Sequence, residues 1–155
     1  MIKALIVDDQ ELFRESLKVV LGVNPEIEVT DAVPGVAEAL KSAARECPDV
    51  VLMDIRMPGM DGVEATRQIR ELIGDESAII ILTAYNWDDV AEKAEVTRKI
   101  AKEYDTAFVP LQEIFNEACK RAPMEYWLRD GVHPTLNGHQ LIAREWLRAF
   151  YSLGV

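Results

Sequence analysis

Three aspartates follow short apolar runs and have the chemistry to hold a cation together. Asp8 and Asp9 come directly after the run Ile2–Val7, and Asp54 comes directly after Val50–Met53. Carboxylates that converge repel one another, raise one another's pKa and favour a hard cation between them. Magnesium suits such a set because it binds a few carboxylates and keeps waters that a phosphate can displace. A carboxylate beside the ion can attack phosphorus and form an aspartyl phosphate. These residues therefore indicate magnesium binding and phosphoryl transfer.

A second pair of residues has a different chemistry. Asp130 stands three residues before His133, and Pro134 follows directly. On a tight loop, a carboxylate at this spacing can fix the tautomer of the imidazole and stabilise the imidazolium. The pair could serve as the acid and base of a nucleophilic hydrolase, provided that a nucleophile lies within reach.

The chain must bring these residues to one place, and its pattern predicts how. Apolar runs alternate with amphipathic stretches, which is typical of a parallel α/β sheet. Strands are expected at Ile2–Val7, Glu28–Ala32, Val50–Met53, Ala78–Thr83 and Thr106–Val109. Helices are expected at about 11–21, 35–46, 62–72, 88–104, 111–120 and 135–153.

Five strands joined by right-handed crossovers predict one flavodoxin-like, doubly wound domain over residues 1–155. The expected strand order is 2-1-3-4-5, in three layers with helices on both faces of the sheet. Such a sheet has its site at the carboxyl ends of strands 1 and 3, where the three aspartates stand. Thr83 ends the fourth strand and could donate a hydroxyl hydrogen bond to a phosphoryl group there.

Aromatic and histidine side chains of the last helix indicate packing. Leu136, His139, Ile142, Ala143, Trp146 and Phe150 fall on one helical stripe. His139 is therefore expected to be packed. Trp127 and Trp146 are expected in the core or against loops, and Trp87 could lie over the site.

Composition narrows the class of protein. Apolar residues make up 49% of the chain and charged residues 28%, as in ordinary globular domains. The net charge of −10 argues against a nucleic-acid or anionic-membrane surface. Cys47 and Cys119 are expected to be free thiols in a reducing compartment. The amino-terminal residues do not form a signal peptide, and no apolar run approaches the ~20 residues of a membrane helix. A soluble, cytoplasmic protein is expected.

The first 90 residues contain three motifs that resemble a known family. Residues 5–16 read Leu-Ile-Val-Asp-Asp-Gln-Glu-Leu-Phe-Arg-Glu-Ser, residues 50–66 read Val-Val-Leu-Met-Asp-Ile-Arg-Met-Pro-Gly-Met-Asp-Gly-Val-Glu-Ala-Thr, and residues 80–85 read Ile-Ile-Leu-Thr-Ala-Tyr. They resemble the receiver domains of bacterial response regulators, which are CheY-like, and particularly the NarL/LuxR type attached to DNA-binding modules.

This resemblance implies specific roles for the acidic residues. Asp54 corresponds to the phosphoacceptor, and Asp8 and Asp9 correspond to the acidic pair that binds magnesium. The main-chain carbonyl of Arg56 corresponds to the third protein ligand of the ion, and Thr83 to the switch threonine. A histidine kinase or a small phosphodonor would supply the phosphoryl group.

One feature of receivers is absent from the sequence. In receivers, a lysine at the end of the fifth strand contacts the phosphoryl group. Residues 106–112 read Thr-Ala-Phe-Val-Pro-Leu-Gln, without a lysine. The departure argues against a switch driven by phosphorylation.

The last 60 residues resemble a different family. Residues 98–115, and residues 128–143 with Leu-Arg-Asp-Gly-Val-His-Pro at their start, are similar to the end of an SGNH (GDSL-type) esterase or lipase. The resemblance implies that Asp130 and His133 are the triad acid and base. The family's Gly-Asp-Ser is replaced by residues 8–10, Asp-Asp-Gln, and the blocks that build its oxyanion hole are missing. Esterase activity above background is therefore not expected.

Two interpretations of His133 remain open. It is either a relic held by Asp130 or solvent, or it faces the acidic cluster, where it could bind a transition metal or pair with a phosphoryl group.

The two resemblances predict a chimera. Its receiver-like part would be residues 1–90 and its SGNH-like part residues 91–155, with a junction between Tyr85 and Arg98. The favoured hypothesis is an engineered fold chimera without evolved activity, which retains a magnesium-binding pocket. The alternatives are a natural fusion, a working receiver phosphorylated on Asp54, and a weak SGNH-type hydrolase using Asp130 and His133. The oligomeric state is left open.

Overall fold

The computed structural model describes residues 1–59, 62–75, 77–83, 90–131 and 133–153. At residues 62, 63, 83, 90–94 and 96 only the backbone is described. Trp87 and residues 85–89 of the interval expected to contain the chimera junction lie outside these residues.

The described residues form a five-stranded, all-parallel sheet in the order β2-β1-β3-β4-β5, as predicted. The strands are β1 (Ile2–Val7), β2 (Ile27–Val33), β3 (Val50–Asp54), β4 (Ala78–Thr83) and β5 (Ala107–Pro110). The central strands β1, β3 and β4 are almost entirely Val, Ile, Leu, Ala and Met, because helices bury both of their faces.

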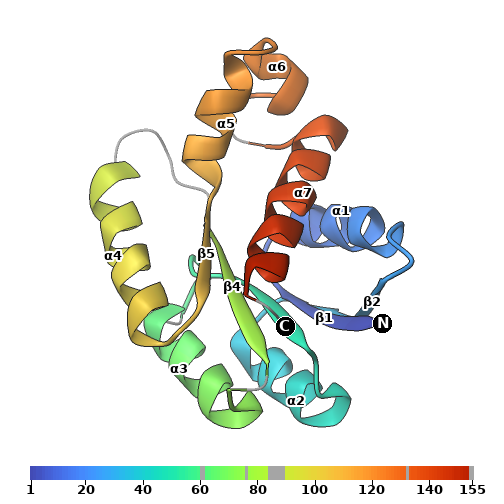
Figure 1. Ribbon diagram of the computed structural model, residues 1–155, viewed down its shortest axis with the longest axis vertical. Coiled ribbons are helices and arrows are strands. Elements are labelled where there is room, and N and C mark those ends of the chain that lie inside the picture. The colour runs from blue at the N-terminus through green and yellow to red at the C-terminus, as the bar shows by residue number, and fades with distance from the viewer. Residues whose placement is uncertain (60–61, 76, 84–89, 132, 154–155) are drawn as a thin grey trace.

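Helices cover both faces of the sheet (Figure 1). They are α1 (Glu11–Gly22), α2 (Val36–Glu46), α3 (Gly62–Ile73), α4 (Val90–Glu103), α5 (Leu111–Cys119), α6 (Met124–Trp127) and α7 (Leu136–Ser152). One hydrophobic cluster joins α1 and α7 to strand residues such as Ala4 and Ile6. The other joins α2, α3 and α4 to the alternate strand residues, such as Leu5 and Val7. The predicted three-layer architecture is confirmed.

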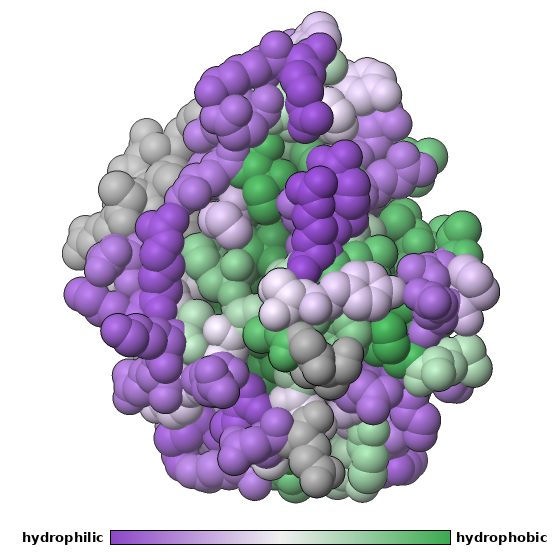
Figure 2. Space-filling view, in the orientation of Figure 1, coloured by the Kyte–Doolittle hydropathy of each residue, from purple (hydrophilic) through white to green (hydrophobic). Residues whose placement is uncertain are grey.

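The chain beyond β5 departs from a plain alternation of strands and helices. Helix α5 begins directly after β5 and runs beyond the carboxyl ends of the strands, and α6 follows it before α7 returns along the sheet (Figure 1). Apolar surface is visible between the hydrophilic side chains of α5 and α7, where a groove contains Ile114 and Leu141 (Figure 2). No helix is predicted between residues 120 and 135, but α6 lies within this interval; at four residues it is too short for a periodic pattern.

The predicted apolar stripe of α7 is largely confirmed. His139, Ile142 and Trp146 are buried, and Phe150 packs against Trp146. Leu136, however, is 66% exposed. It is the first residue of α7, and the backbone of α6 covers the opposite side of that first turn.

Gly138 lets the first turn of α7 rest on the end of α6. A Cβ atom at this position would lie 2.2 Å from the carbonyl oxygen of Trp127. Thr135 caps the helix by accepting a hydrogen bond from the Gly138 N–H at 3.2 Å, and its hydroxyl donates to the Tyr126 carbonyl at 2.7 Å. The start of α7 and the α6 segment therefore form one unit.

Both cysteines, Cys47 and Cys119, are free, as predicted. Among the described residues, no helix combines the length and the apolar character that a membrane span requires.

We expect Gly138→Ala to lower the free energy of unfolding by about 2 to 4 kcal/mol, since the new methyl group has to displace backbone. Urea unfolding followed by circular dichroism measures this change. Gly22→Ala, in which the added Cβ meets no atom within 4 Å, is the matched control and should change stability by less than about 1 kcal/mol. Equal effects of the two substitutions would contradict the close contact between α7 and α6.

Candidate functional site

The three sequence-predicted aspartates meet at the carboxyl edge of the sheet. Strands β1 and β3 are neighbours, with Val7 opposite Met53, so the residues that follow them lie side by side. One ligand atom from each of Asp8, Asp9 and Asp54 lies within 4.8 Å of the others. The parallel register, rather than any local motif, brings the carboxylates together.

Short turns orient two of these carboxylates. Asp8 accepts a hydrogen bond from the backbone N–H of Gln10 at 2.8 Å, and Asp54 accepts one from the backbone N–H of Arg56 at 2.9 Å. The side chain of Arg14 donates to the Asp8 carbonyl at 2.7 Å and fixes the end of β1. Oδ1 of Asp9 is buried and has no hydrogen-bond partner within the described part of the chain. This buried carboxylate oxygen is therefore one that a donor or a cation would satisfy.

Burial makes the charges of the cluster unfavourable. It raises the pKa of Asp8 to about 7, and the neighbouring charge of Asp54 adds to the shift, while the Gln10 N–H opposes it. Burial also raises the pKa of Asp54 to about 6, against the Arg56 N–H and with a further contribution from Asp9. A proton or a cation would relieve this repulsion.

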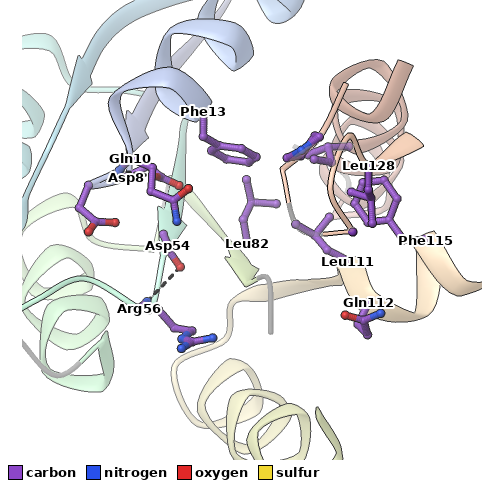
Figure 3. Close-up of a pocket in the computed structure, with 14 residues that line it drawn as sticks. Asp8, Gln10, Phe13, Asp54, Arg56, Leu82, Leu111, Gln112, Phe115 and Leu128 are labelled. Carbon is purple, nitrogen blue, oxygen red and sulfur yellow. Dashed lines mark hydrogen bonds between the residues drawn. The ribbon is translucent and has the colours of Figure 1, made fainter. Parts of the chain in front are cut away.

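A cavity of about 290 Å³ adjoins the cluster (Figure 3). On one side it is lined by Asp8, Asp9 and Asp54, with Gln10 and Arg56 beside them. On the other side it is lined by apolar side chains of α1, β4, α5, α7 and the segment between α6 and α7, which are Phe13, Leu82, Leu111, Phe115, Leu128 and Ile142. The site is thus acidic at one end and apolar at the other.

The donor set fits magnesium. Three carboxylates within reach of one another and a buried oxygen without a partner are what a hard, oxygen-seeking cation satisfies. Arg56 lines the same cavity. The part of its main-chain carbonyl as a further ligand stays a prediction.

Two other positions bear on the binding of a phosphoryl group, which are Thr83 and the end of β5. Thr83 ends β4, and its backbone pairs with Pro110 of β5, but its side chain lies outside the described part. At the end of β5 no lysine is found, as the sequence indicates; Leu111 and Gln112 line the cavity there. Among the described residues that line the cavity, Arg56 is the one with a positively charged side chain.

Asp130 and His133 are hydrogen-bonded to each other in the segment between α6 and α7. Oδ2 of Asp130 lies 2.7 Å from Nδ1 of His133, and Oδ1 of Asp130 accepts the backbone N–H of His133 at 2.8 Å. Both side chains are 53% exposed. Gly131 and Pro134 of the same segment line the cavity, whereas His133 is not among its described lining residues. That His133 faces the acidic cluster stays a prediction.

The apolar end of the cavity was not predicted from the sequence. Leu111, Phe115 and Leu128 are all buried. From the sequence, their apolar character indicates core residues and does not indicate a cavity. The helical spacing of Leu111 and Phe115 was the available signal, but it does not show that this face of α5 turns toward the aspartates.

Comparison with known proteins places the site in a family context. The sequence model described as "Response regulator receiver domain" matches residues 4–107. The transcriptional regulatory protein LiaR of Bacillus subtilis is 43% identical over 89 residues, covering 57% of this chain and 42% of LiaR. Protein-glutamate methylesterase/protein-glutamine glutaminase 1 of Syntrophus aciditrophicus is 44% identical over 84 residues, covering 54% of this chain and 23% of that protein.

Solved structures show the same similarity. The response regulator domain of Thermotoga maritima CheB is 27% identical with a TM-score of 0.56, covering 70% of this chain and 77% of that chain. A DNA-binding response regulator of the LuxR family from Staphylococcus aureus is 25% identical with a TM-score of 0.57, covering 70% and 85%.

These matches cover only part of each relative, and the family match extends past the expected chimera junction. The chain spans less than half the length of LiaR and about a quarter of the methylesterase. The matched residues 4–107 also reach beyond the interval 85–98 in which sequence analysis expects a chimera junction, and they end at the first residue of β5.

We expect Asp8→Asn to stabilise the cation-free protein increasingly as the pH rises. A carboxyl group whose folded pKa is raised binds its proton more tightly in the folded state. Its stabilising effect is therefore lost as the pH rises from the unfolded value of about 4 toward 7. Asparagine has no charge to lose, so the variant should be more stable than wild type by about 2 to 4 kcal/mol at about pH 8 and by little at about pH 4.

Urea unfolding in EDTA at several pH values measures this difference between the two proteins. Subtracting wild type cancels the opposite effect of His139, whose pKa burial lowers. Asp75→Asn, at an exposed aspartate beyond α3, is the control and should show no such trend. A stability difference for Asp8→Asn that is independent of pH would contradict the raised pKa of Asp8.

Proposed function

The chain belongs to the response regulator receiver domain family, and on this premise we propose that Asp54 accepts a phosphoryl group at a magnesium-dependent site. The observation that carries the proposal is the convergence of Asp8, Asp9 and Asp54 within 4.8 Å on one side of a cavity. Asp8 and Asp9, together with Asp54 and the Arg56 carbonyl, would hold the ion. When bound, the ion supplies positive charge that offsets the charge on the phosphoryl oxygens.

The residues of the chain prepare Asp54 for attack. Its pKa of about 6 leaves the carboxylate mostly ionised at neutral pH, as a nucleophile requires. The Arg56 N–H holds Oδ1 and thereby orients the carboxylate plane. The Arg56 side chain brings a positive charge to the cavity, which lowers the pKa of Asp54 and favours the approach of an anionic phosphodonor.

The donor is proposed to be a histidine kinase or a small phosphodonor. LiaR is a transcriptional regulatory protein and the second relative a methylesterase, but the segment matched in each is less than half of that protein. The absence of a nucleic-acid partner stays a prediction from the net charge of −10. A switch that depends on a lysine at the end of β5 is not proposed, since Leu111 and Gln112 lie there.

The hypothesis of an engineered chimera without evolved activity also stays a prediction. The hydrogen-bonded pair of Asp130 and His133 favours an SGNH-like origin of the C-terminal part, because this is the arrangement that the resemblance implies. Against a junction between 85 and 98, the receiver match continues to residue 107. A junction nearer to β5 is consistent with both observations.

An SGNH-type hydrolase is less well supported than a receiver. Among the described residues that line the cavity, none is a serine, threonine or cysteine. The positions after β1 hold Asp8, Asp9 and Gln10 in place of a nucleophilic serine. A hydroxyl or thiol nucleophile is therefore not found among these lining residues.

Magnesium should stabilise the wild-type protein and not Asp9→Asn. Binding to the folded state alone raises the free energy of unfolding by about 2.7 kcal/mol at 100 times Kd. Thermal unfolding with and without magnesium measures the effect, and Asp75→Asn should respond like wild type. An equal response of Asp9→Asn would place the binding of magnesium elsewhere.

Acetyl phosphate with magnesium should add one phosphoryl group to the wild-type chain and none to Asp54→Asn, as measured by intact mass. The substitution removes the nucleophile while leaving the turn to Arg56 able to form. Asp75→Asn should be labelled at the wild-type rate. Labelling of Asp54→Asn, or no labelling of the wild type in the presence of bound magnesium, would disprove the proposed acceptor.

A further inference from the structure

We propose that the preferred phosphodonor of this site is a small acyl phosphate with an apolar acyl group, for example an aroyl phosphate. The proposal rests on the proposed function and names its substrate class. It is based on the cavity that joins Asp54 to the apolar side chains of α5 and of the segment before α7 (Figure 3).

The cavity offers two different environments a short way apart. At the acidic end, Asp54 lies with Arg56 beside it. Gln112 lines the cavity from α5, next to Leu111, and its amide nitrogen donates to Oδ1 of Asn116 at 3.1 Å (Figure 3). At the other end lie Leu111 and Phe115, which are 2% and 6% exposed. A ligand that spans the cavity must therefore combine an anionic, hydrogen-bonding group with an apolar one.

The apolar end discriminates between acyl groups. Its described lining residues Leu82, Leu111, Phe115, Leu128 and Ile142 offer no side-chain donor or acceptor. A charged or hydroxylated acyl group would lose its hydrogen bonds to water there without replacement. An aryl or branched alkyl group would gain free energy by leaving water.

The size of the cavity favours a small molecule. At about 290 Å³ it lies near the lower end of the range of about 300 to 1,000 Å³ that is usual for small-molecule sites. Leu111, Phe115, Leu128 and Ile142 all lie beyond residue 107, where the receiver match ends. Four of the six residues of the apolar wall thus lie outside the matched sequence, and Phe13 and Leu82 lie within it.

The chemical step balances with the groups present. An oxygen of the Asp54 carboxylate forms a bond to phosphorus, while the bond between phosphorus and the acyl oxygen of the donor breaks. The electron pair of that bond leaves with the acyl oxygen, so an apolar carboxylate is released and Asp54 becomes an acyl phosphate. No oxidant is needed and no net proton is transferred.

The test compares the labelling rates of benzoyl phosphate and acetyl phosphate, at equal low concentration with magnesium, by intact mass. In wild type we expect benzoyl phosphate to react about tenfold faster, equivalent to about 1.4 kcal/mol. Gln112→Trp places an indole at the cavity and should bring the ratio of the two rates close to that of the donors' reactions with water. Asn116→Trp is the matched control: it removes the same Gln112–Asn116 hydrogen bond and adds the same bulk to α5, at an exposed position outside the cavity lining.

A preference for benzoyl phosphate that is lost in Gln112→Trp and kept in Asn116→Trp supports the proposal. Equal rates in wild type overturn it, and so does a preference that Gln112→Trp leaves unchanged. In either of those cases labelling by acetyl phosphate still upholds Asp54 as acceptor.

If neither donor labels the chain, the acceptor role of Asp54 is disproved. A binding measurement then tests whether the cavity takes a ligand with an apolar group. Saturation-transfer NMR with phenylphosphonate and magnesium should then show transfer to the phenyl protons in wild type and Asn116→Trp but not in Gln112→Trp. Absence of transfer in wild type would overturn the cavity as a site for apolar donors.

Discussion

The register between β1 and β3 is the constraint on which the site depends. It places Val7 opposite Met53, so that Asp8, Asp9 and Asp54 emerge together at one edge of the sheet despite their mutual repulsion. Burial, with a smaller contribution from the mutual repulsion, raises the pKa values of Asp8 and Asp54. Buried aliphatic side chains on both faces of these strands supply the free energy that holds the carboxylates in place. The edge is thereby ready for a cation or a proton.

The C-terminal part completes the fold and reshapes the site. Helix α7 covers the same face of the sheet as α1, with Trp146 and Phe150 in the cluster that also contains Ile6 and Leu17. Helices α5 and α6 precede it and extend beyond the carboxyl edge (Figure 1). Residues of α5, of the segment after α6 and of α7 border the cavity beside the acidic cluster and make it apolar on one side (Figure 3). The acidic cluster at the sheet edge and an apolar wall formed largely by the C-terminal part thus meet in one pocket.

The close contact at Gly138 explains how this wall is held. Because no side chain separates α7 from the Trp127 carbonyl, the start of α7 fixes the α6 segment. Thr135 adds hydrogen bonds to the carbonyls of Tyr126 and Trp127 at 2.7 and 3.1 Å. The Asp130–His133 pair lies in the segment that these contacts enclose. Its internal hydrogen bonds give the exposed segment a defined shape, independently of any catalytic role.

By itself, the sequence determined the sheet and the acidic edge. The near-continuous Val, Ile and Leu runs predict buried parallel strands, and the aspartates at their ends predict the cluster, because strand order in such a sheet leaves few alternatives. The four-residue helix α6, the exposed Leu136 and the apolar end of the cavity were decided by tertiary structure. Each depends on which face of α5 or α7 meets a segment distant in sequence, and helical periodicity shows that a face is apolar without showing what lies opposite it.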